Sequence, residues 1–323
     1  MVRIELIEAH DLNFHFYAEF QKAAFQDLLL NSKATDSHMN PEFYKWKYCT
    51  PVGNGKIARV MDGDKILSSS AMIPFNVHFG MSILKGWHCL DVATLPQERR
   101  KGYFLATLKT LKSSIGENEV FFAFPNSGSI PSFKKLGCVE NTILTTWINP
   151  FIFKKVKNFN EIREKKCFGP EHDAFIKNLG LIETHLDHSS SYLNWRYAYH
   201  PIHQYSIFVF ENEGEYLGYA VVRKARALGR NIVLIMELWG LNNTIKINFL
   251  RFLTDWTSAQ KEKILILMST DTTFFQAFKA SFLPIPSFLL PKKQVLVIHT
   301  AGQKADAVKL KQWKIQTGDW DVF

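Results

Sequence analysis

The sequence predicts an α/β protein with mixed sheets, built from two tandem domains. The chain has 323 residues, which exceeds the usual size of one domain and suggests two of roughly 150 residues each. Strand-like and helix-like segments alternate along it, and their order in the second half repeats that of the first. A short aromatic motif occurs once in each half. Together these observations indicate a duplicated α/β unit.

The first half is predicted to run strand, helix, three strands, helix, strand, helix, strand. Residues Val2–Glu8 alternate apolar and charged side chains, as a half-buried strand does. From Asp11 to Leu30 apolar residues recur every four positions, which predicts an amphipathic helix with Asp11 as its N-cap. The remaining elements are expected at Lys56–Met61, Lys65–Ile73, Ser82–Thr94, Gly102–Ser114, Val120–Phe124, Ile130–Leu136 and Val139–Trp147.

The repeated motif combines an aromatic residue, Trp, a cation, Tyr and a nearby Pro. Its copies lie at Trp46–Tyr48 and Trp195–Tyr197, followed by Pro51 and Pro201. We interpret both copies as core anchors rather than acceptor pockets. The elements after the second copy are expected at Tyr205–Phe210, Glu215–Val222, Asn231–Trp239, Thr244–Gln260 (helix), Ile264–Met268, Thr273–Ala280 (helix) and Gln294–Thr300.

These elements set the expected domain boundaries. Residues 1–148 form the first domain and residues 170–300 the second. Residues 149–169 are basic and aromatic without clear periodicity, and they are assigned as a linker. Residues 301–323 form a tail that either docks by its aromatic side chains or frays.

Composition narrows the classes of protein and partner. The net charge of +9 would suit an anionic cofactor or substrate, but the lysines are spread out and no nucleic-acid-binding signature accompanies them, which argues against nucleic acid. The 4 cysteines lack zinc-ligand spacing, so no metal site is expected. No apolar run is long enough to span a bilayer and the start is acidic, so we expect a cytoplasmic protein. A homodimer is left open.

The densest chemistry lies between Asp91 and Lys109. A β-branched stretch ends at Pro96, the cations Arg99, Arg100 and Lys101 precede Gly102, and an amphipathic helix pattern follows at once. Such a turn presents backbone N–H groups and the positive end of a helix dipole, with a glycine that lets a ligand approach closely. This arrangement suits a pyrophosphate.

The turn resembles the acyl-CoA site of the GNAT (GCN5-related) N-acyltransferase family, and Arg99–Phe104 stands at the family's Gln/Arg-x-x-Gly-x-Gly/Ala signature. The last small position is occupied here by Phe104. The resemblance implies tandem GNAT-like domains of bacterial type, and it implies contacts to acetyl-CoA or another acyl-CoA from Ala93, Thr94, Arg99, Arg100, Lys101, Gly102, Tyr103 and Phe104. The segment Phe121–Asn126 resembles the family's next strand, so Asn126 is a further predicted contact.

Acyl transfer to an amine requires a proton acceptor. The resemblance places His88 where some family members carry a catalytic Glu, and an imidazole titrates near neutral pH. Asp91 lies nearer the cofactor, although a strand alternates its faces unless a bulge intervenes. The family often uses a Tyr to protonate the leaving thiolate. Phe133 stands at that position, so Tyr103, Ser132 or water would replace it.

The two halves differ at the cofactor turn. The second passes from Trp239-Gly240 through Leu241–Asn243 into its helix without the cations. We therefore expect acyl-CoA in the first half only and a degenerate second half. The predicted function is N-acyl transfer to a small-molecule amine or amino-sugar by direct attack. Two alternatives remain: an aminoacyl-tRNA-dependent transferase of the peptidoglycan-bridge type, and a non-catalytic acyl-CoA or metabolite-binding protein.

Overall fold

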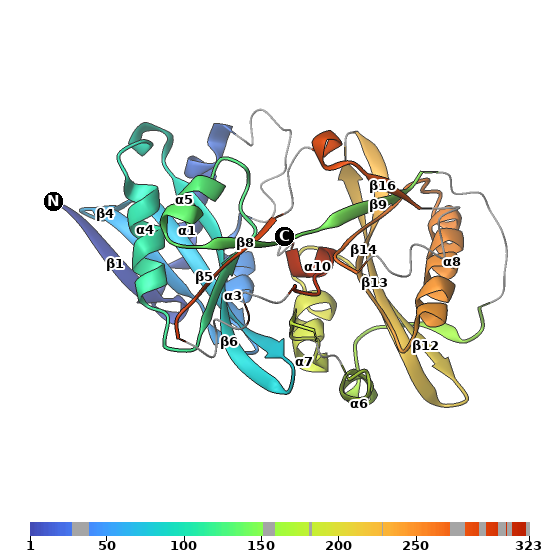
Figure 1. Ribbon diagram of the computed structural model, residues 1–323. Coiled ribbons are helices and arrows are strands. Elements are labelled where there is room, and N and C mark those ends of the chain that lie inside the picture. The colour runs from blue at the N-terminus through green and yellow to red at the C-terminus, as the bar shows by residue number, and fades with distance from the viewer. Residues whose placement is uncertain are drawn as a thin grey trace. The chain divides into compact units, whose positions relative to one another are not determined.

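A computed structural model gives the fold of the chain (Figure 1). It describes residues 1–27, 39–150, 159–180, 183–227, 229–271, 282–290, 295–302, 308 and 312–320. The chain forms two compact units, each built from two separate stretches of sequence. The first comprises residues 1–141 and 295–312, and the second comprises residues 142–294 and 313–322.

The first unit is a mixed sheet with strand order β1-β4-β5-β6-β7-β17-β8. The pairs β1–β4, β4–β5 and β5–β6 are antiparallel, whereas β6 pairs in parallel with β7. The strands of the sheet are β1 Val2–Glu8, β4 Lys56–Asp62, β5 Lys65–Phe79, β6 Ser82–Thr94, β7 Val120–Ala123, β8 Val139–Ile143 and β17 Val295–Thr300. The helices are α1 Phe14–Ala24, α3 Pro41–Tyr48, α4 Tyr103–Ser113 and α5 Ile130–Lys135; the short strands β2 Cys49–Thr50 and β3 Gly53–Asn54 pair separately.

The second unit repeats this plan with strand order β10-β12-β13-β14-β15-β9-β16. Its strands are β9 Thr145–Asn149, β10 Ile162–Lys165, β12 Ser206–Asn212, β13 Glu215–Ala227, β14 Arg230–Gly240, β15 Leu265–Ser269 and β16 Leu283–Ile285, and β11 is His185–Leu186. Its helices are α6 Pro170–Asn178, α7 Ser190–Leu193 with a π-turn at Asn194–Ala198, α8 Asn243–Ala259 and α10 Thr317–Trp320.

One strand of each sheet comes from the half of the sequence that was expected to form the other domain. β17, expected at the end of the second domain, pairs antiparallel with β7 of the first unit. β9, expected as part of a single strand Val139–Trp147, lies between β15 and β16 of the second unit. The contiguous boundaries 1–148 and 170–300 are therefore corrected to the two interleaved units. Periodicity reports that a segment is a strand but not which sheet it joins.

Three further expectations differ from the structure. The first helix begins after Asn13, whose side-chain oxygen accepts from the amide of Phe16, and not after Asp11. The linker 149–169 contains strand β10, which pairs with β12. The tail is not separate either, because residues 313–320 belong to the second unit. The helix expected at Thr273–Ala280 lies outside the described residues.

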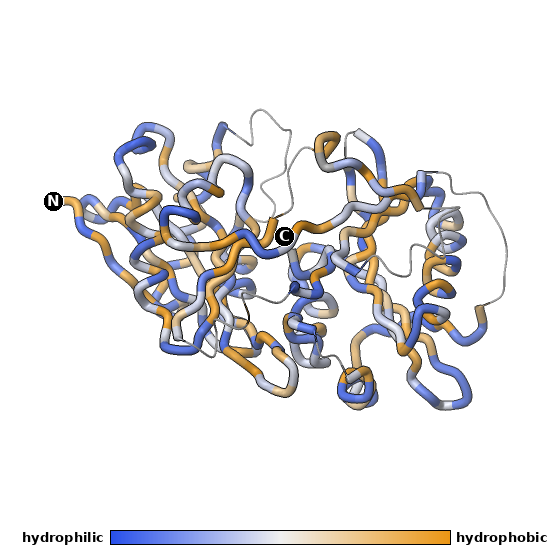
Figure 2. The backbone as a smooth tube through the Cα atoms, viewed as in Figure 1, coloured by the Kyte–Doolittle hydropathy of each residue, from blue (hydrophilic) through white to orange (hydrophobic). Residues whose placement is uncertain are grey.

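Each sheet packs a helix against one face. In the first unit, Leu108 and Leu111 of α4 join Trp87, Phe121 and Val297 in a buried cluster. In the second, Phe249 and Leu253 of α8 pack on strand residues in the same manner. Figure 2 shows α8 alternating between hydrophobic and hydrophilic residues, as a helix with one buried face does. None of the described helices is long and apolar enough to cross a membrane.

Candidate functional site

Strands β6 and β7 separate at the point where the predicted site begins. They pair over Gly86–Cys89 and Val120–Ala123, after which β6 runs on to Thr94 paired with β5 but no longer with β7. The pairing of β6 with β5 shifts register in the same region, and Asp91 has a positive φ of 49°. A bulge of this kind re-aims side chains and frees backbone groups. The exposed edge of β6 after the bulge is therefore open to a ligand.

The turn before α4 has the geometry that its glycine predicts. Gly102 is the N-cap of α4 with φ 84° and no side-chain cap, and a Cβ added there would meet nothing within 4 Å. Arg100 also has a positive φ, 67°. The first N–H groups of a helix have no intrahelical partner. The α4 N-terminus thus presents donors beside open space.

A pocket of about 490 Å³ lies at this end of β6. The predicted residues Ala93, Thr94, Arg99, Arg100, Gly102, Tyr103 and Phe104 all line it. Further lining comes from Ala24, Phe25, Val92, Glu98, Leu105, Ser132 and Lys135, which the sequence did not assign to the cofactor. The end of α1 and the helix α5 reach the pocket through tertiary packing, so no local pattern reveals them.

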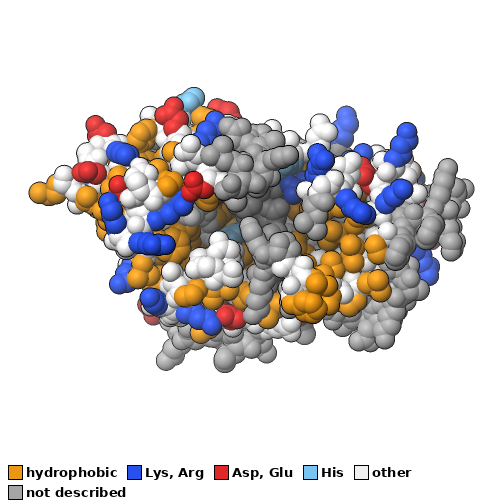
Figure 3. All heavy atoms as spheres, turned by 90° about the horizontal axis from the view of Figure 1, so that it is seen from above, with side chains coloured by type: hydrophobic (Ala, Val, Ile, Leu, Met, Phe, Trp, Pro, Cys, Tyr) orange, Lys and Arg blue, Asp and Glu red, His pale blue; other side chains and the backbone are white. Residues whose placement is uncertain are grey.

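The charge of the pocket is predominantly positive. Arg99, Arg100 and Lys135 line it, against the single carboxylate of Glu98. Arg99 is held by Asp27 at 2.9 Å and by the carbonyl of Ala24 at 3.1 Å. On the face shown in Figure 3, Lys and Arg lie among acidic and uncharged residues. The pocket therefore offers a local anion site.

Lys101 differs from its neighbours in the turn. Its ammonium lies 2.9 Å from Glu98 in an exposed ion pair, and hydrogen bonding to Glu98 raises its pKa. Lys101 is not among the pocket-lining residues. Its predicted cofactor contact is therefore the one that the geometry of the turn favours least.

Asp91 lies in a buried polar network rather than in the pocket lining. Its carboxylate is 2.9 Å from the ammonium of Lys47 and accepts a hydrogen bond of 2.8 Å from Tyr48. The Tyr48 hydroxyl lies 3.0 Å from that of Tyr17, which accepts from Gln21 at 2.8 Å. Burial raises the pKa of both tyrosines, so they stay protonated at neutral pH. The network fixes the bulged part of β6 to α1 and α3.

His88 is enclosed by aromatic rings. Its side chain stacks on Phe122 with centroids 4.9 Å apart and meets Phe75 and Phe124 edge-on. The residue is only 3% exposed and does not line the pocket. These contacts are those of a packed side chain in the sheet.

Asn126 lies in the turn before α5. Its side-chain oxygen accepts from the amide and the hydroxyl of Ser129 at 3.0 and 3.1 Å. Asn126 is not among the pocket-lining residues, whereas Ser132 and Lys135 of the following helix are. No group of three or more His, Cys, Asp or Glu within the described parts of the chain is arranged to hold a metal ion.

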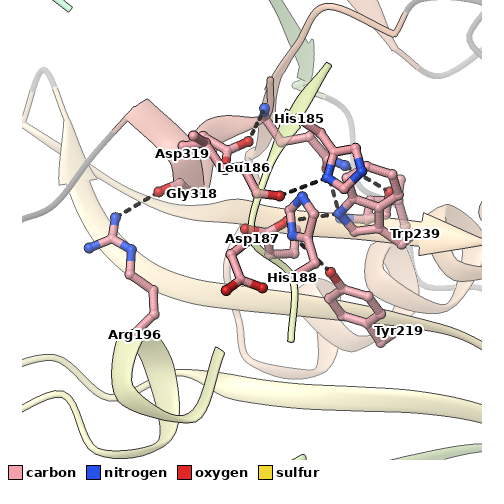
Figure 4. A network of polar contacts seen from close by, with 12 residues as sticks. His185, Leu186, Asp187, His188, Arg196, Tyr219, Trp239, Gly318 and Asp319 are labelled. Atoms are coloured by element: carbon pink, nitrogen blue, oxygen red, sulfur yellow. Dashed lines mark hydrogen bonds and ion pairs between the residues drawn. The ribbon is translucent and has the colours of Figure 1, made fainter. Parts of the chain in front are cut away.

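The second unit contains a counterpart of the Asp91 network. Tyr197 donates a hydrogen bond of 2.6 Å to Glu237, and Trp239 donates one of 2.9 Å to the same carboxylate. Burial raises the pKa of Glu237 to about 7. Figure 4 shows neighbouring groups of this network, including Arg196, His188 and Asp319. The two copies of the repeated motif thus each tie a helix to the bulged strand of their own unit.

Comparison with known proteins identifies the fold. Residues 7–139 match the family model described as Acetyltransferase (GNAT) domain. No curated protein matches the sequence.

Solved structures extend the similarity over both units. A GCN5-related N-acetyltransferase from Anabaena variabilis aligns with a TM-score of 0.68 and 14% identity over 92% of this chain and 72% of that one. A GCN5-related N-acetyltransferase from Kribbella flavida aligns with a TM-score of 0.56 and 10% identity, over 92% of this chain and 71% of that one. Saccharomyces cerevisiae N-myristoyltransferase with bound myristoyl-CoA aligns with a TM-score of 0.57 and 12% identity, over 95% of this chain and 87% of that one. At these sequence identities the structures show a similarity of fold alone. The predicted α/β fold is thereby confirmed, and residues 7–139 match the GNAT acetyltransferase domain model.

Proposed function

We propose that the first unit is an N-acyltransferase that takes its acyl group from an acyl-CoA, with acetyl-CoA as the default donor. The observation that carries this proposal is the pocket at the uncapped N-terminus of α4, where Gly102 leaves open backbone beside Arg99, Arg100 and Lys135. Free N–H groups, a helix dipole and neighbouring cations together attract phosphate. The pocket also has the size typical of a small-molecule site.

The free edge of β6 would hold the remainder of the donor. Val92, Ala93 and Thr94 line the pocket after the point where β6 and β7 separate. Their backbone groups are suited to pair with an extended amide-containing chain, as an added strand would. The N-myristoyltransferase of similar fold contains bound myristoyl-CoA, which supports a CoA thioester as the class of donor.

The reaction proposed is direct attack by a neutral amine on the thioester carbonyl. The new C–N bond forms, the C–S bond breaks, and the amine loses a proton while the thiolate leaves. The protein contributes chiefly by positioning both reactants and by directing N–H donors at developing charge. Tyr103 and Ser132 line the pocket. Together with water, they are the proposed proton donors to the thiolate. A small-molecule amine or amino-sugar is the proposed acceptor.

Of the two predicted proton acceptors, we favour Asp91 over His88. His88 is surrounded by aromatic rings, whereas Asp91 adjoins the pocket residue Val92 and connects to a chain of protonated tyrosines. The Lys47 ammonium and the Tyr48 hydroxyl hold the Asp91 carboxylate in the buried network, away from the pocket lining. We therefore assign Asp91 the role of positioning β6, with water between it and the amine in any proton transfer.

Calorimetric titration with acetyl-CoA and with free CoA tests the donor site. Gly102→Glu should abolish binding, because the new carboxylate would enter the phosphate position. Gly63→Glu is the matched control: Gly63 also has a positive φ, 57°, and open space around its Cβ, but it lies in the β4–β5 turn. The control adds the same charge and the same backbone strain away from the pocket. Equal loss of affinity in the two variants, or unchanged affinity in both, would refute the proposal.

A second candidate is a protein that binds acyl-CoA without transferring the acyl group. It is favoured by one observation, that neither His88 nor Asp91 lines the pocket. Saturable acetyl-CoA binding without release of free thiol across a broad panel of amines would support it. An aminoacyl-tRNA donor would instead be indicated by tight tRNA binding with a steep salt dependence and no binding of acetyl-CoA.

A further inference from the structure

The second unit contains the same strand separation as the first. β14 pairs in parallel with β15 only over Val233–Ile235 and Leu265–Leu267, and the register of β13 with β14 shifts immediately afterwards. β14 then continues to Gly240, just as β6 continues past its own bulge to Thr94. The strand positions are equivalent, since β6 and β14 occupy the same place in the two sheet orders. The space after Ile235 therefore corresponds to the pocket beside Val92–Thr94.

In the second unit that space is filled by the chain itself. The segment Trp313–Asp319, named here the C-terminal strap, bonds to both separated strands. The Gln316 side chain accepts from the amide of Leu238 at 2.8 Å and donates to its carbonyl at 3.1 Å. The Thr317 hydroxyl accepts from the amide of Met268 at 2.9 Å and donates to its carbonyl at 3.3 Å. The strap thus satisfies backbone groups on β14 and β15 that strand pairing leaves open.

Backbone contacts fix the strap in this position. Gln316 forms an antiparallel bridge with Ser269, and the Thr270 amide donates to the Ile315 carbonyl at 2.9 Å. The side chain of Asp319 accepts from the Gln316 amide at 2.9 Å and closes the turn at the end of the strap. Trp313 and Ile315 are completely buried, and Gln316, Thr317 and Asp319 are nearly so. The segment is therefore integrated into the core of its unit.

The strap also meets the second copy of the repeated motif. Arg196 donates a hydrogen bond of 2.7 Å to the carbonyl of Gly318 (Figure 4). A Cβ on Gly318 would collide with the Tyr197 hydroxyl and with a carboxylate oxygen of Glu237. A glycine is required here because of this close approach. In the first unit the corresponding cation, Lys47, pairs with Asp91 instead.

The N-terminus of α8, the helix that follows β14, is also occupied by groups of the protein itself. The Asn242 side chain caps α8 by accepting from the amide of Ile245 at 3.0 Å. The equivalent helix α4 begins at Gly102 without a side-chain cap. In addition, Gly240 has Ile245 packed against its Cβ position, whereas Gly102 faces open space. The two ends of a donor site, the strand edge and the helix N-terminus, are thus both occupied in the second unit.

We infer that the C-terminal strap occupies the space in the second unit that corresponds to the donor pocket of the first unit, here called the donor slot. The chain therefore binds one acyl-CoA, in the first unit. This inference rests on the proposed function for its donor, but the occupancy of the slot can be measured without any donor. Duplication leaves two slots, and an unfilled one would expose backbone groups in an apolar interior. The strap removes that cost without a ligand.

Amide hydrogen exchange on the full chain tests the strap directly. In the double variant Gln316→Ala/Thr317→Val, the amides of Leu238 and Met268 lose their acceptors. Peptides covering 236–240 and 266–270 should then exchange at least about tenfold faster, with no change in peptides covering 92–94. Unchanged exchange on β14 and β15 would overturn the inference. If the double variant does not fold, Thr317→Val alone makes the same test at Met268.

A matched control separates the strap from a general loss of hydrogen bonds. Thr254→Val/Gln260→Ala removes the same side-chain types from the same unit, where Thr254 bonds the Leu250 carbonyl at 2.7 Å and Gln260 bonds Lys224 at 2.8 Å. Neither of these hydrogen bonds involves the strap segment. Exchange at Leu238 and Met268 should match the unsubstituted chain, and equally fast exchange in this control would overturn the inference.

The number of acetyl-CoA molecules bound per chain provides a second test of the inference. The unsubstituted chain should bind acetyl-CoA at one site, Gly102→Glu should bind none, and acetyl-CoA should slow exchange at 92–94 but not at 237–240. A site that survives Gly102→Glu and protects 237–240 would overturn the inference. No binding by the unsubstituted chain would refute the proposed function instead, and the exchange of the strap variants would still decide whether the slot is filled.

Discussion

The hydroxyl of Tyr48 donates a hydrogen bond of 2.8 Å to the carboxylate of Asp91. The hydroxyl of Tyr197 donates one of 2.6 Å to Glu237 at the same place in the other sheet. Tyr48, Trp195 and Tyr197 are buried, as expected of core anchors, whereas Trp46 is only partly buried. In both units the anchor holds the strand at its bulge, where the edge leaves its neighbour.

Removing the cation of the first anchor should destabilise the first unit. Lys47→Met keeps the length of a side chain that is 0% exposed but leaves the Asp91 carboxylate without its partner. We expect a cost of about 3–5 kcal/mol, measured as a shift of the urea unfolding transition. The control is Lys134→Met, which breaks the exposed pair with Glu140 and should cost less than about 1 kcal/mol. Equal shifts would contradict a stabilising role of the buried pair.

Reversing the charge of Lys135 should weaken donor binding. Lys135 lines the pocket, while its neighbour Lys134 pairs with Glu140 and does not line it. We expect Lys135→Glu to raise the dissociation constant of acetyl-CoA about tenfold at low salt and less at high salt, because the effect is electrostatic. Lys134→Glu makes the same charge change one residue away. Calorimetry showing equal losses would place the phosphates elsewhere.

The role of His88 can be decided from the dependence of rate on pH. His88→Phe retains an aromatic ring among Phe75, Phe122 and Phe124 but removes the titrating group. Once an acceptor is known, we expect kcat/KM to keep its pH profile in this variant. A drop of about 100-fold or more with loss of one limb of the pH profile would instead make His88 the base.

Glu237 should make stability depend on pH in the second unit. Burial raises the pKa of Glu237 to about 7 from the ordinary value of 4.5, so the folded state holds this proton more tightly than the unfolded state. The stabilisation is complete below about pH 4.5 and is lost as the pH rises through about 7. Burial and the nearby Glu237 also raise the pKa of Asp319, which acts with the same sign.

Glu237→Gln isolates this contribution. Its amide oxygen can accept from Trp239 and its amide nitrogen can donate to Tyr197, so the network keeps its hydrogen bonds. We expect urea unfolding of the variant to vary less between pH 4.5 and 7 than that of the unsubstituted chain. An identical slope in that window would mean that Glu237 does not carry the proton.

Much of the site follows from local sequence. Gly102 after three cations and before an amphipathic pattern predicts a helix N-terminus that faces a ligand, and the structure places Gly102 as the N-cap of α4 beside the pocket. The sequence places Asp91 nearer the cofactor than His88, although strand residues alternate faces unless a bulge intervenes, and a register shift is present there. That bulge turns the carboxylate towards Lys47 and Tyr48, which lie far away in sequence.

Local sequence patterns predict the element types, the duplicated order and the glycine turn before α4, because hydrophobic period, turn residues and helix signals act over a few neighbouring residues. Only the tertiary structure decided the exchange of β9 and β17 between sheets, the partners of Asp91 and the place of the C-terminal strap. These depend on which distant segment satisfies an open strand edge. That choice is made by hydrogen bonding and burial across the whole unit, which no local pattern encodes.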